Sequence, residues 1–544
     1  MRNAVWVWLA AGVLSACGGR SEEWDAPVGV PVQTEGLTGS VAVVDEGLDR
    51  LLMLTVPSGH MLEATEIPLG KNLALAQASP DRRNLFVLTH GVQSAKEDEE
   101  PTLTVVSGGT RPAVCKRYEL DNPYSRVTVD PEGEWVALYD ADAFVGNANE
   151  IILAQLGDLT DCHRLSDSRR RGSIIARTLA SEGGSPVRLT FTPELLLPGG
   201  PRRFLIVERD HDVDLLDLQA LVDEAPHDEI RMSLLAAASG VSGTPLEVVY
   251  YPGDPEVDDD FASIAVRLAN DTSVQFMDFV TSDNPDLDYE VTVNAAELGG
   301  VPDDIEFVQT DGGIRLAGLL ASHRSAVLVD PATSETRTIN VNGRYDHLSP
   351  ITQELVRGGE ATDGGDVALL WSPNERSVAY WNLGEAIRAP HFSVNQYDIG
   401  ISVGEVLDIP GQAYPQLKLL RSLSDAQFYV LDLGERSVHR MDSEAAAPDI
   451  SVAPDGRRAW IYKPGFEQIA VTNFEDLHPS ELQVERDVSA VWDIKRVGDG
   501  RAALVMHQYA NGEAAMLAAT LFDAEEPSST DTRFYGGLLL RGVR

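Results

Sequence analysis

The hydrophobic positions of this chain recur as pairs of short apolar segments separated by a polar turn. Residues 41–44 (VAVV) are followed by residues 51–54 (LLML), and residues 316–320 (LAGLL) are followed by residues 326–330 (AVLVD). Pairs of this length, bounded by turn residues, are typical of antiparallel β-hairpins. Further pairs begin near Leu85, Trp135, Phe204, Ala262, Val367, Gln427, Arg458 and Ala502. Most successive pairs begin 44 to 69 residues apart, so the pattern predicts an all-β chain of repeated four-stranded sheets.

Turns containing Pro and an acidic residue precede several of these pairs, as at residues 79–82, 130–133 and 453–456. Pro presets φ for the first corner of a turn, and Asp or Gly suits the next positions. Residues 79–88 (SPDRRNLFVL) and 452–461 (VAPDGRRAWI) resemble the junction between blades of YVTN-type and WD40-like β-propellers. The resemblance implies one β-propeller domain over residues 37–544, with blades of four antiparallel strands.

The spacing of the pairs is uneven, which bears on the number of blades. Long inserts lie at residues 93–101 and 161–188, and the pairs at Gln427 and Arg458 begin only 31 residues apart. That interval is too short for two complete blades, so we expect seven or eight blades with some strands as insertions. Residues 534–540 (FYGGLLL) remain after the last pair, and we expect this segment to complete the first blade and close the ring.

The amino terminus carries the pattern of an export signal. One positive charge at Arg2 precedes an apolar run over residues 4–14, which is too short to span a bilayer. Residues 14–17 (LSAC) resemble the lipobox of bacterial lipoproteins. The resemblance implies a signal peptide over residues 1–16 and a lipidated Cys17 as the first mature residue. A flexible tether would then cover residues 17–36.

The resemblance also bears on where the protein is located. Gly18 is not the Asp that retains enteric lipoproteins on the inner membrane. We therefore expect a protein that is lipid-anchored in the cell envelope, at the outer membrane, facing either the periplasm or the cell surface.

The charge of the chain limits its partners. The formal net charge is −42, and 43% of the residues are hydrophobic, which supplies a core and argues against disorder. So negative a surface repels phosphate backbones, and we expect no binding to nucleic acid. An acidic surface also keeps an exported protein soluble, while cations or a basic protein are the partners that it attracts.

Cysteine and acidic clusters are the remaining candidates for sites. Beyond Cys17 the chain contains only Cys115 and Cys162, and an oxidising compartment favours a disulfide between them. The opposing consideration is that outer strands of neighbouring blades diverge, while a disulfide needs Cα atoms within ~7 Å. Asp and His are suitable ligands for a divalent ion. The candidate metal ligands are Asp210, His211, Asp212, Asp214, Asp254, Glu256, Asp258, Asp259 and Asp260.

Both acidic clusters also have a structural explanation. Asp is favoured in hairpin turns because it hydrogen-bonds nearby main chain. The second cluster lacks the spaced Gly and terminal bidentate Glu of an EF-hand loop, so the sequence allows Ca²⁺ there but does not indicate it, and we expect no other cofactor.

No catalytic motif is present in the sequence, so no catalytic residue is assigned. The chain has no His-Glu-x-x-His pair and no G-x-S-x-G elbow. We therefore expect a non-enzymatic binding or scaffolding module, with an envelope protein or a polysaccharide as partner. Two alternatives stay open. A metal-dependent hydrolase or lactonase-like propeller would need carboxylates that converge near the central channel. A carbohydrate-binding protein would need an exposed row of aromatic residues. The candidates for that row are Trp135, Trp371, Trp381, Trp460 and Trp492, whose default role is packing.

Overall fold

With one exception, each apolar pair of the sequence supplies the two middle strands of a four-stranded antiparallel sheet in the computed structural model of the chain. The structure describes residues 33–536 with gaps at 58–60, 94–97, 142–146, 148, 158, 160–161, 165–169, 180–184, 224–227, 235–242, 258–259, 284–287, 352–365, 392, 411–412, 423, 425–426, 436, 443–448, 498–499 and 512–513. Cys17, the expected signal peptide and most of the expected tether therefore lie outside the described residues.

The sheets, here called blades 1 to 10, follow one another in sequence order, and the strands of each follow one another along the chain, interrupted in blades 2 and 4 by a small hairpin. Blades 1 to 5, from the inner strand outward, are β1 (Gln33–Gly36), β2 (Val41–Asp45), β3 (Arg50–Thr55) and β4 (Glu63–Ile67); β5 (Leu73–Ala78), β6 (Asn84–Thr89), β9 (Thr102–Ser107) and β10 (Val114–Glu119); β11 (Arg126–Val129), β12 (Trp135–Tyr139), β13 (Glu150–Gln155) and β14 (Ile174–Thr178); β15 (Arg188–Phe191), β18 (Phe204–Glu208), β19 (Asp212–Asp217) and β20 (Glu229–Ser233); and β21 (Pro245–Tyr251), β22 (Ser263–Leu268), β23 (Ser273–Val280) and β24 (Glu290–Glu297).

Blades 6 to 10 are β25 (Asp304–Thr310), β26 (Gly313–Leu320), β27 (Ser325–Val329) and β28 (Thr336–Asn340); β29 (His347–Ile351), β30 (Val367–Trp371), β31 (Ser377–Asn382) and β32 (Val394–Asp398); β33 (Glu405–Asp408), β34 (Leu417–Arg421), β35 (Gln427–Asp432) and β36 (Ser437–Asp442); β37 (Asp449–Val452), β38 (Arg458–Tyr462), β39 (Gln468–Asn473) and β40 (Pro479–Gln483); and β41 (Val488–Lys495), β42 (Arg501–Asn511), β43 (Ala514–Asp523) and β44 (Arg533–Tyr535). Two small hairpins, β7 (Val92–Gln93) with β8 (Asp98–Glu99) and β16 (Leu195–Leu197) with β17 (Gly200–Arg202), are insertions.

The chain is thus an all-β, WD40-like propeller, but the expected number of blades is wrong: the structure has ten blades, not seven or eight. The error comes from the segment at Gln427. This segment is the third strand of its blade, and the second strand is the preceding β34. Blades 8 and 9 are both complete, with four strands each. They occupy few residues because the turns between their strands are short.

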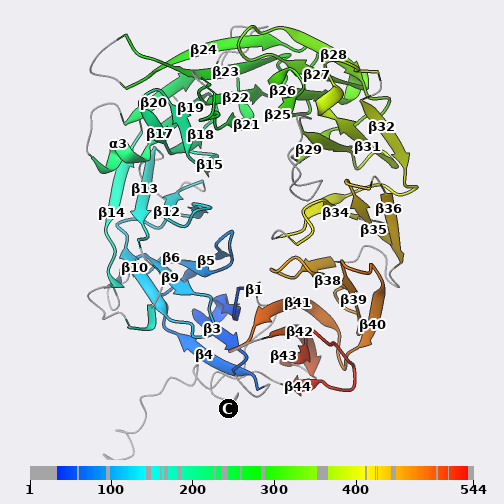
Figure 1. Ribbon diagram of the computed structural model, residues 1–544. Helices are drawn as coiled ribbons and strands as arrows, with labels where there is room; N and C mark the ends of the chain where they lie inside the picture. Colours follow the sequence, from blue (N-terminus) through cyan, green and yellow to red (C-terminus); the bar gives the residue numbers. More distant parts are fainter. Residues whose placement is uncertain are drawn as a thin grey trace, which may run out of the picture.

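The continuous apolar runs of the middle strands follow from burial on both faces. In β2, Val41 and Val43 pack toward blade 10, whereas Ala42 and Val44 pack toward blade 2. Each pair of neighbouring blades shares one hydrophobic cluster, which gives ten clusters for ten seams. A sheet buried on both faces does not alternate apolar with polar residues. The clusters therefore close the blades into a ring (Figure 1).

Blade 10 and blade 1 meet at a seam where, among the described residues, no strand is shared between the two sheets (Figure 1). The indole Nε1 of Trp492 donates a hydrogen bond to the Thr34 hydroxyl at 3.2 Å. The Lys495 amide donates to the Thr38 carbonyl at 2.8 Å. These contacts and one apolar cluster hold the two ends of the ring together.

The expected closure by residues 534–540 is wrong in its described part. The first blade already has four strands, with its inner strand β1 starting at Gln33, inside the segment expected to be a tether. Phe534 and Tyr535 lie in β44 of blade 10. Leu538–Leu540 lies outside the described residues.

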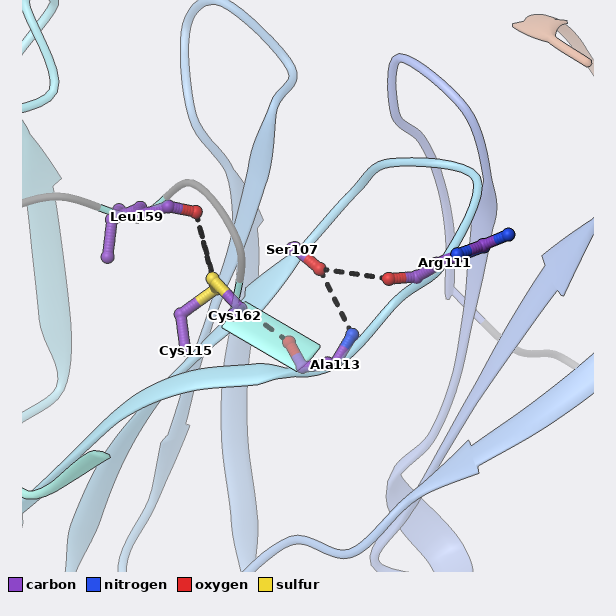
Figure 2. Close-up of a disulfide and its surroundings, with 6 residues drawn as sticks. All are labelled: Ser107, Arg111, Ala113, Cys115, Leu159 and Cys162. Carbon is purple, nitrogen blue, oxygen red and sulfur yellow. Dashed lines mark hydrogen bonds between the residues drawn. A yellow bond between two sulfur atoms is a disulfide. The ribbon is translucent and has the colours of Figure 1, made fainter. Parts of the chain in front are cut away.

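The predicted disulfide between Cys115 and Cys162 is confirmed, with a Cα–Cα distance of 4.6 Å (Figure 2). The expected divergence of outer strands does not oppose it, because only Cys115 lies on an outer strand. Cys162 begins the short 3-10 helix η3 (Cys162–Arg164), which lies between β13 and β14 in the sequence and contacts β10 of blade 2. Next to the disulfide, the Gly172 amide donates to the Arg117 carbonyl at 3.1 Å. Both cysteines are buried in the cluster between these blades.

Among the described residues, no helix has the length and apolar character needed to cross a membrane.

Candidate functional site

A cavity of about 670 Å³ lies between blades 5 and 6, at the end of the seam where β21 turns into β22 and β25 turns into β26. Its size falls in the range of small-molecule sites. Among the described residues, four aspartates line it and Arg315 is the single basic residue in the lining. The aspartates are Asp254, Asp260, Asp278 and Asp330.

Neutral donors orient two of the four carboxylates. The Tyr251 hydroxyl donates to Asp260 at 2.6 Å. Asp278 accepts from the Ser263 hydroxyl at 2.7 Å and from the Asn294 amide at 3.1 Å. Hydrogen bonds from neutral groups fix the position of a carboxylate without cancelling its charge. Burial and the adjacent Asp260 both raise the pKa of the Tyr251 phenol, so this residue stays a proton donor.

The other two carboxylates are held differently. Asp254 accepts the amide hydrogen of Glu256 at 2.9 Å, which is the turn-forming bond expected of Asp in a loop. Asp330 pairs with the Arg315 guanidinium at 3.1 Å, and both side chains are about a quarter exposed or less, at 24% and 21%. With one of four carboxylates neutralised in this way, the cavity keeps an excess of three negative charges.

Apolar side chains also line the cavity: Phe261, Val280, Ile314 and Pro331 are partly buried. Phe279 is buried and packs on Phe204 and Tyr289 in the cluster between blades 4 and 5. A wall of this kind binds the hydrocarbon body of a ligand, while the carboxylates select the group at its end.

The insertion hairpin β16–β17 of blade 4 positions the loop that carries Asp254 and Asp260. The Leu196 amide donates to the Pro252 carbonyl at 2.7 Å, and the Leu196 carbonyl accepts from the Ala262 amide at 2.8 Å. Gly253, between them, has φ of 86°, and a Cβ at this position would lie 2.9 Å from Leu196 Cβ. Glycine is therefore required where the hairpin meets the loop.

A second acidic group lies on the inner strands of the same two blades. It consists of Glu247 on β21 together with Asp304 and Glu306 on β25, and sequence analysis did not identify it. Burial, followed by the charge of Glu247, raises the pKa of Asp304 to about 8 and that of Glu306 to about 7. The hydrolase alternative requires several carboxylates on the inner strands, and this group is the candidate for them. Two of its members, however, already accept hydrogen bonds from the main chain. Glu247 accepts from the Ile305 amide at 3.2 Å, and Asp304 accepts from the Leu348 amide at 2.6 Å.

The first predicted metal cluster is divided in the structure. Asp210 and His211 form the exposed turn between β18 and β19, whereas Asp212 and Asp214 are buried. Asp214 pairs with the fully buried Arg209 at 3.3 Å. Burial raises the pKa of Asp214 to about 7, against the opposing effect of Arg209.

The second predicted metal cluster contributes Asp254 and Asp260 to the cavity lining, while Glu256 is exposed. Asp258 and Asp259 lie outside the described residues. In the part of the chain that the structure describes, no group of three or more His, Cys, Asp or Glu side chains is placed to hold a metal ion.

The tryptophans pack within and between blades, as their default role implies. Trp381 and Trp460 are fully buried, and Trp135 is 4% exposed. Trp371 stacks on His347 with ring centroids 4.1 Å apart, and Trp492 lies at the closing seam.

No protein-family model matches the sequence, and no curated protein matches it. Among solved structures, the chain is similar to dihydro-heme d1 dehydrogenase NirN in complex with DHE, with 13% identity, 75% of this chain and 74% of that chain covered, and a TM-score of 0.42. It is similar to apo AztD from Citrobacter koseri, with 10% identity, coverage of 74% and 95%, and a TM-score of 0.33. It is also similar to the β-propeller domain of Cps50 (Swd1) from Myceliophteria thermophila, with 12% identity, coverage of 66% and 95%, and a TM-score of 0.32. These likenesses concern the fold alone.

Proposed function

We propose that this protein is a lipid-anchored binding protein of the cell envelope that holds a small organic cation in the cavity between blades 5 and 6. The observation that carries this proposal is the lining of that cavity, with four aspartates and one arginine beside an apolar wall. A net charge of −42 over the whole chain adds a field that attracts cations.

The two sides of the cavity define the ligand class. A cation with an apolar body, such as an arylalkylamine, would place its ammonium group beside the aspartates that line the cavity and its hydrocarbon body against Val280 and Ile314. An ammonium group donates three hydrogen bonds, which suits a site that presents several carboxylate oxygens. A neutral ligand of the same shape would leave the excess negative charge uncompensated.

The envelope location is supported by the lipobox at residues 14–17 and by the Cys115–Cys162 disulfide, which is favoured in an oxidising compartment. Acylation of Cys17 would anchor the ring to the outer membrane. Labelling with radioactive palmitate in a bacterial host tests this part separately: the full chain is expected to be labelled and the Cys17→Ala variant not. An unlabelled wild-type chain would refute the anchor and leave the cation site standing.

Isothermal titration calorimetry on the full chain tests the cation site. 2-Phenylethylamine is expected to bind, and 2-phenylethanol, which has the same ring and chain but no charge, is not. Asp278→Asn removes one carboxylate charge and should weaken binding about tenfold, equivalent to about 1.4 kcal/mol. Glu256→Gln removes one charge from the exposed side of the same region and should have little effect. Equal binding of amine and alcohol, or equal effects of the two substitutions, would refute the proposal.

A further inference from the structure

A second cavity, of about 500 Å³, lies at the opposite end of the strands from the cation site. It is formed where β2 turns into β3 and where the inner strands β5 and β11 begin, whereas the cation site lies where β21 turns into β22 and β25 turns into β26. Blades 1, 2 and 3 all contribute to its lining, so this cavity spans two seams of the ring (Figure 1). Its volume also falls in the range of small-molecule sites.

Groups of opposite charge line this cavity from its two flanking blades. Blade 1 contributes the carboxylates of Glu46 and Asp49, whereas blade 3 contributes the guanidinium of Arg126. Blade 2 lies between these two blades in the ring. The cation site carries an excess of negative charge, but here the negative and the positive groups face each other across the contribution of blade 2.

Local structure holds the acidic side in place. Glu46 begins the 3-10 helix η2 (Glu46–Leu48), and Asp49 is its C-cap with a φ of 49°, in the left-handed region that Asp tolerates better than most residues. One oxygen of Asp49 accepts a hydrogen bond from the Leu73 amide of blade 2 at 2.8 Å. An ionised carboxylate accepts through both of its oxygens, so this bond orients Asp49 across the seam and does not exhaust its capacity to bind a ligand.

Two polar side chains of blade 2 are held between the charged groups. The Asn72 side-chain amide donates to the Gly91 carbonyl at 2.6 Å. The His90 ring donates through Nε2 to the Tyr124 carbonyl at 3.0 Å. An amide side chain that is held through its NH₂ group keeps a carbonyl oxygen, which can accept from a main-chain N–H of a ligand.

Arg126 is the first residue of β11, and the preceding Ser125 fixes the start of that strand. The Ser125 hydroxyl donates to the buried Asp140 at 3.0 Å and accepts from the Ala141 amide at 3.0 Å. Arg126 Nη1 donates to the Ser125 carbonyl at 3.4 Å. A guanidinium has five N–H donors in a planar fork, so Arg126 can also bind a carboxylate through two of them.

We propose that this cavity binds a short polar peptide, with its terminal ammonium group beside Glu46 and Asp49 and its terminal carboxylate beside Arg126. Packed sheets lie about 10 Å apart, so the two charged sides are too far apart for a free amino acid, whose two charged groups are attached to the same carbon atom. Three extended residues span about 10 Å, which makes a tripeptide a ligand that reaches both sides. The apolar side chains of the lining are Leu73, which is buried, and Ala74, so the cavity favours a peptide with polar side chains.

Isothermal titration calorimetry on the full chain tests this proposal with triserine and two blocked forms of it. Triserine amide lacks the terminal carboxylate, and N-acetyl-triserine lacks the terminal ammonium group. Triserine is expected to bind, and each blocked form is expected to bind at least about tenfold more weakly, because it leaves one charged side of the cavity without its partner. Equal binding of all three peptides, or no binding of triserine, would overturn the proposal.

Substitutions on the two sides should have opposite effects. Arg126→Gln should remove the preference for the free carboxylate and keep the preference for the free ammonium group. Glu46→Gln/Asp49→Asn should do the reverse, and the new amide oxygen at position 49 can still accept from Leu73. A preference for the carboxylate that persists in Arg126→Gln, or for the ammonium group in the double variant, would contradict the proposal.

Lys71→Gln is the matched control. Lys71 is exposed and precedes Asn72 in the chain, but it does not line the cavity. This variant loses one positive charge, as Arg126→Gln does, and should keep both preferences. Loss of the carboxylate preference in Lys71→Gln would assign that preference to the general field of the surface and overturn the role of Arg126. The melting temperature of every variant should stay at the wild-type value, which confirms that each one folds.

Discussion

Removal of the Cys115–Cys162 disulfide should destabilise the seam between blades 2 and 3. The change is the double variant Cys115→Ala/Cys162→Ala, which removes the cross-link and places a small apolar side chain at each buried position. Alanine avoids burying two hydroxyl groups in the apolar cluster that surrounds the sulfur atoms.

The expected loss follows from the size of the loop that the disulfide closes. The two cysteines are 47 residues apart, and the chain-entropy relation then gives a loss of about 4 kcal/mol at 25 °C. For a ring of roughly 500 residues that unfolds as one unit, the entropy of unfolding is about 1 kcal/mol per kelvin. The melting temperature should therefore fall by about 4 °C. Locally, the Gly172 amide should lose protection against hydrogen exchange, because its bond to Arg117 is next to the disulfide.

Differential scanning calorimetry on wild type and variant, with and without reductant, measures the effect. Cys17 is the only other cysteine in the chain, so reduction of the wild type should reproduce the shift and should leave the variant unchanged. If reduction and substitution both leave the melting temperature unchanged, the apolar cluster alone holds this seam. If substitution lowers it and reduction does not, the loss comes from packing and the cross-link argument is wrong.

Three further predictions concern other parts of the ring. Arg209→Met should lower the free energy of unfolding by about 3–5 kcal/mol at pH 8, because it leaves the buried Asp214 unpaired. Denaturant titrations should show a smaller loss at pH 5, where Asp214, with a pKa of about 7, is protonated. An equal loss at both pH values would contradict this account. Gly36→Ala should destabilise the closing seam by about 1–3 kcal/mol, because a Cβ there would lie 2.3 Å from the Trp492 ring; calorimetry should show partial recovery in Gly36→Ala/Trp492→Leu, and no recovery would place the strain elsewhere. Calcium at about 1 mM should leave the melting temperature unchanged, because among the described residues no three acidic side chains are placed to hold one ion; a rise that Asp260→Asn abolishes would place an ion in this loop.

The sequence predicts the architecture because middle strands buried on both faces produce short apolar runs, and these runs recur in pairs at a period typical of propeller blades. Nine of these runs mark the second strand of their blade, and the run at Gln427 marks the third. The predicted number of blades is too low because the sequence pattern starts the pair of blade 8 at β35, its third strand, and not at β34, its second strand. The interval to the pair of blade 9 then seems too short for a complete blade. Pairing between strands, which the sequence does not display, is what separates blade 8 from blade 9.

The site was predicted only in part. Asp254 and Asp260 stand out as an acidic loop, but the same local signal suggested a metal ion, whereas the structure adds Asp278, Asp330 and an apolar wall from more distant strands. Glu247, Asp304 and Glu306 carry no motif, since each is one polar position on a strand and their proximity depends on how neighbouring blades pack. The disulfide was correctly predicted from the compartment, while its geometry depends on a loop between blades that spacing does not reveal.

The closing seam has a consequence for how such a ring is made and how its size changes. Among the described residues blade 1 and blade 10 share no strand, so each blade is a contiguous stretch of chain that can complete its own hydrogen bonds during synthesis, before later residues emerge. Only the contact between blades 10 and 1, around Trp492, has to form after blade 10 has been synthesised. Duplication or loss of one such stretch would alter the circumference without depriving any other sheet of a partner. In a propeller closed by strand exchange, the same event must preserve both termini, so the present arrangement leaves blade number free to vary in evolution.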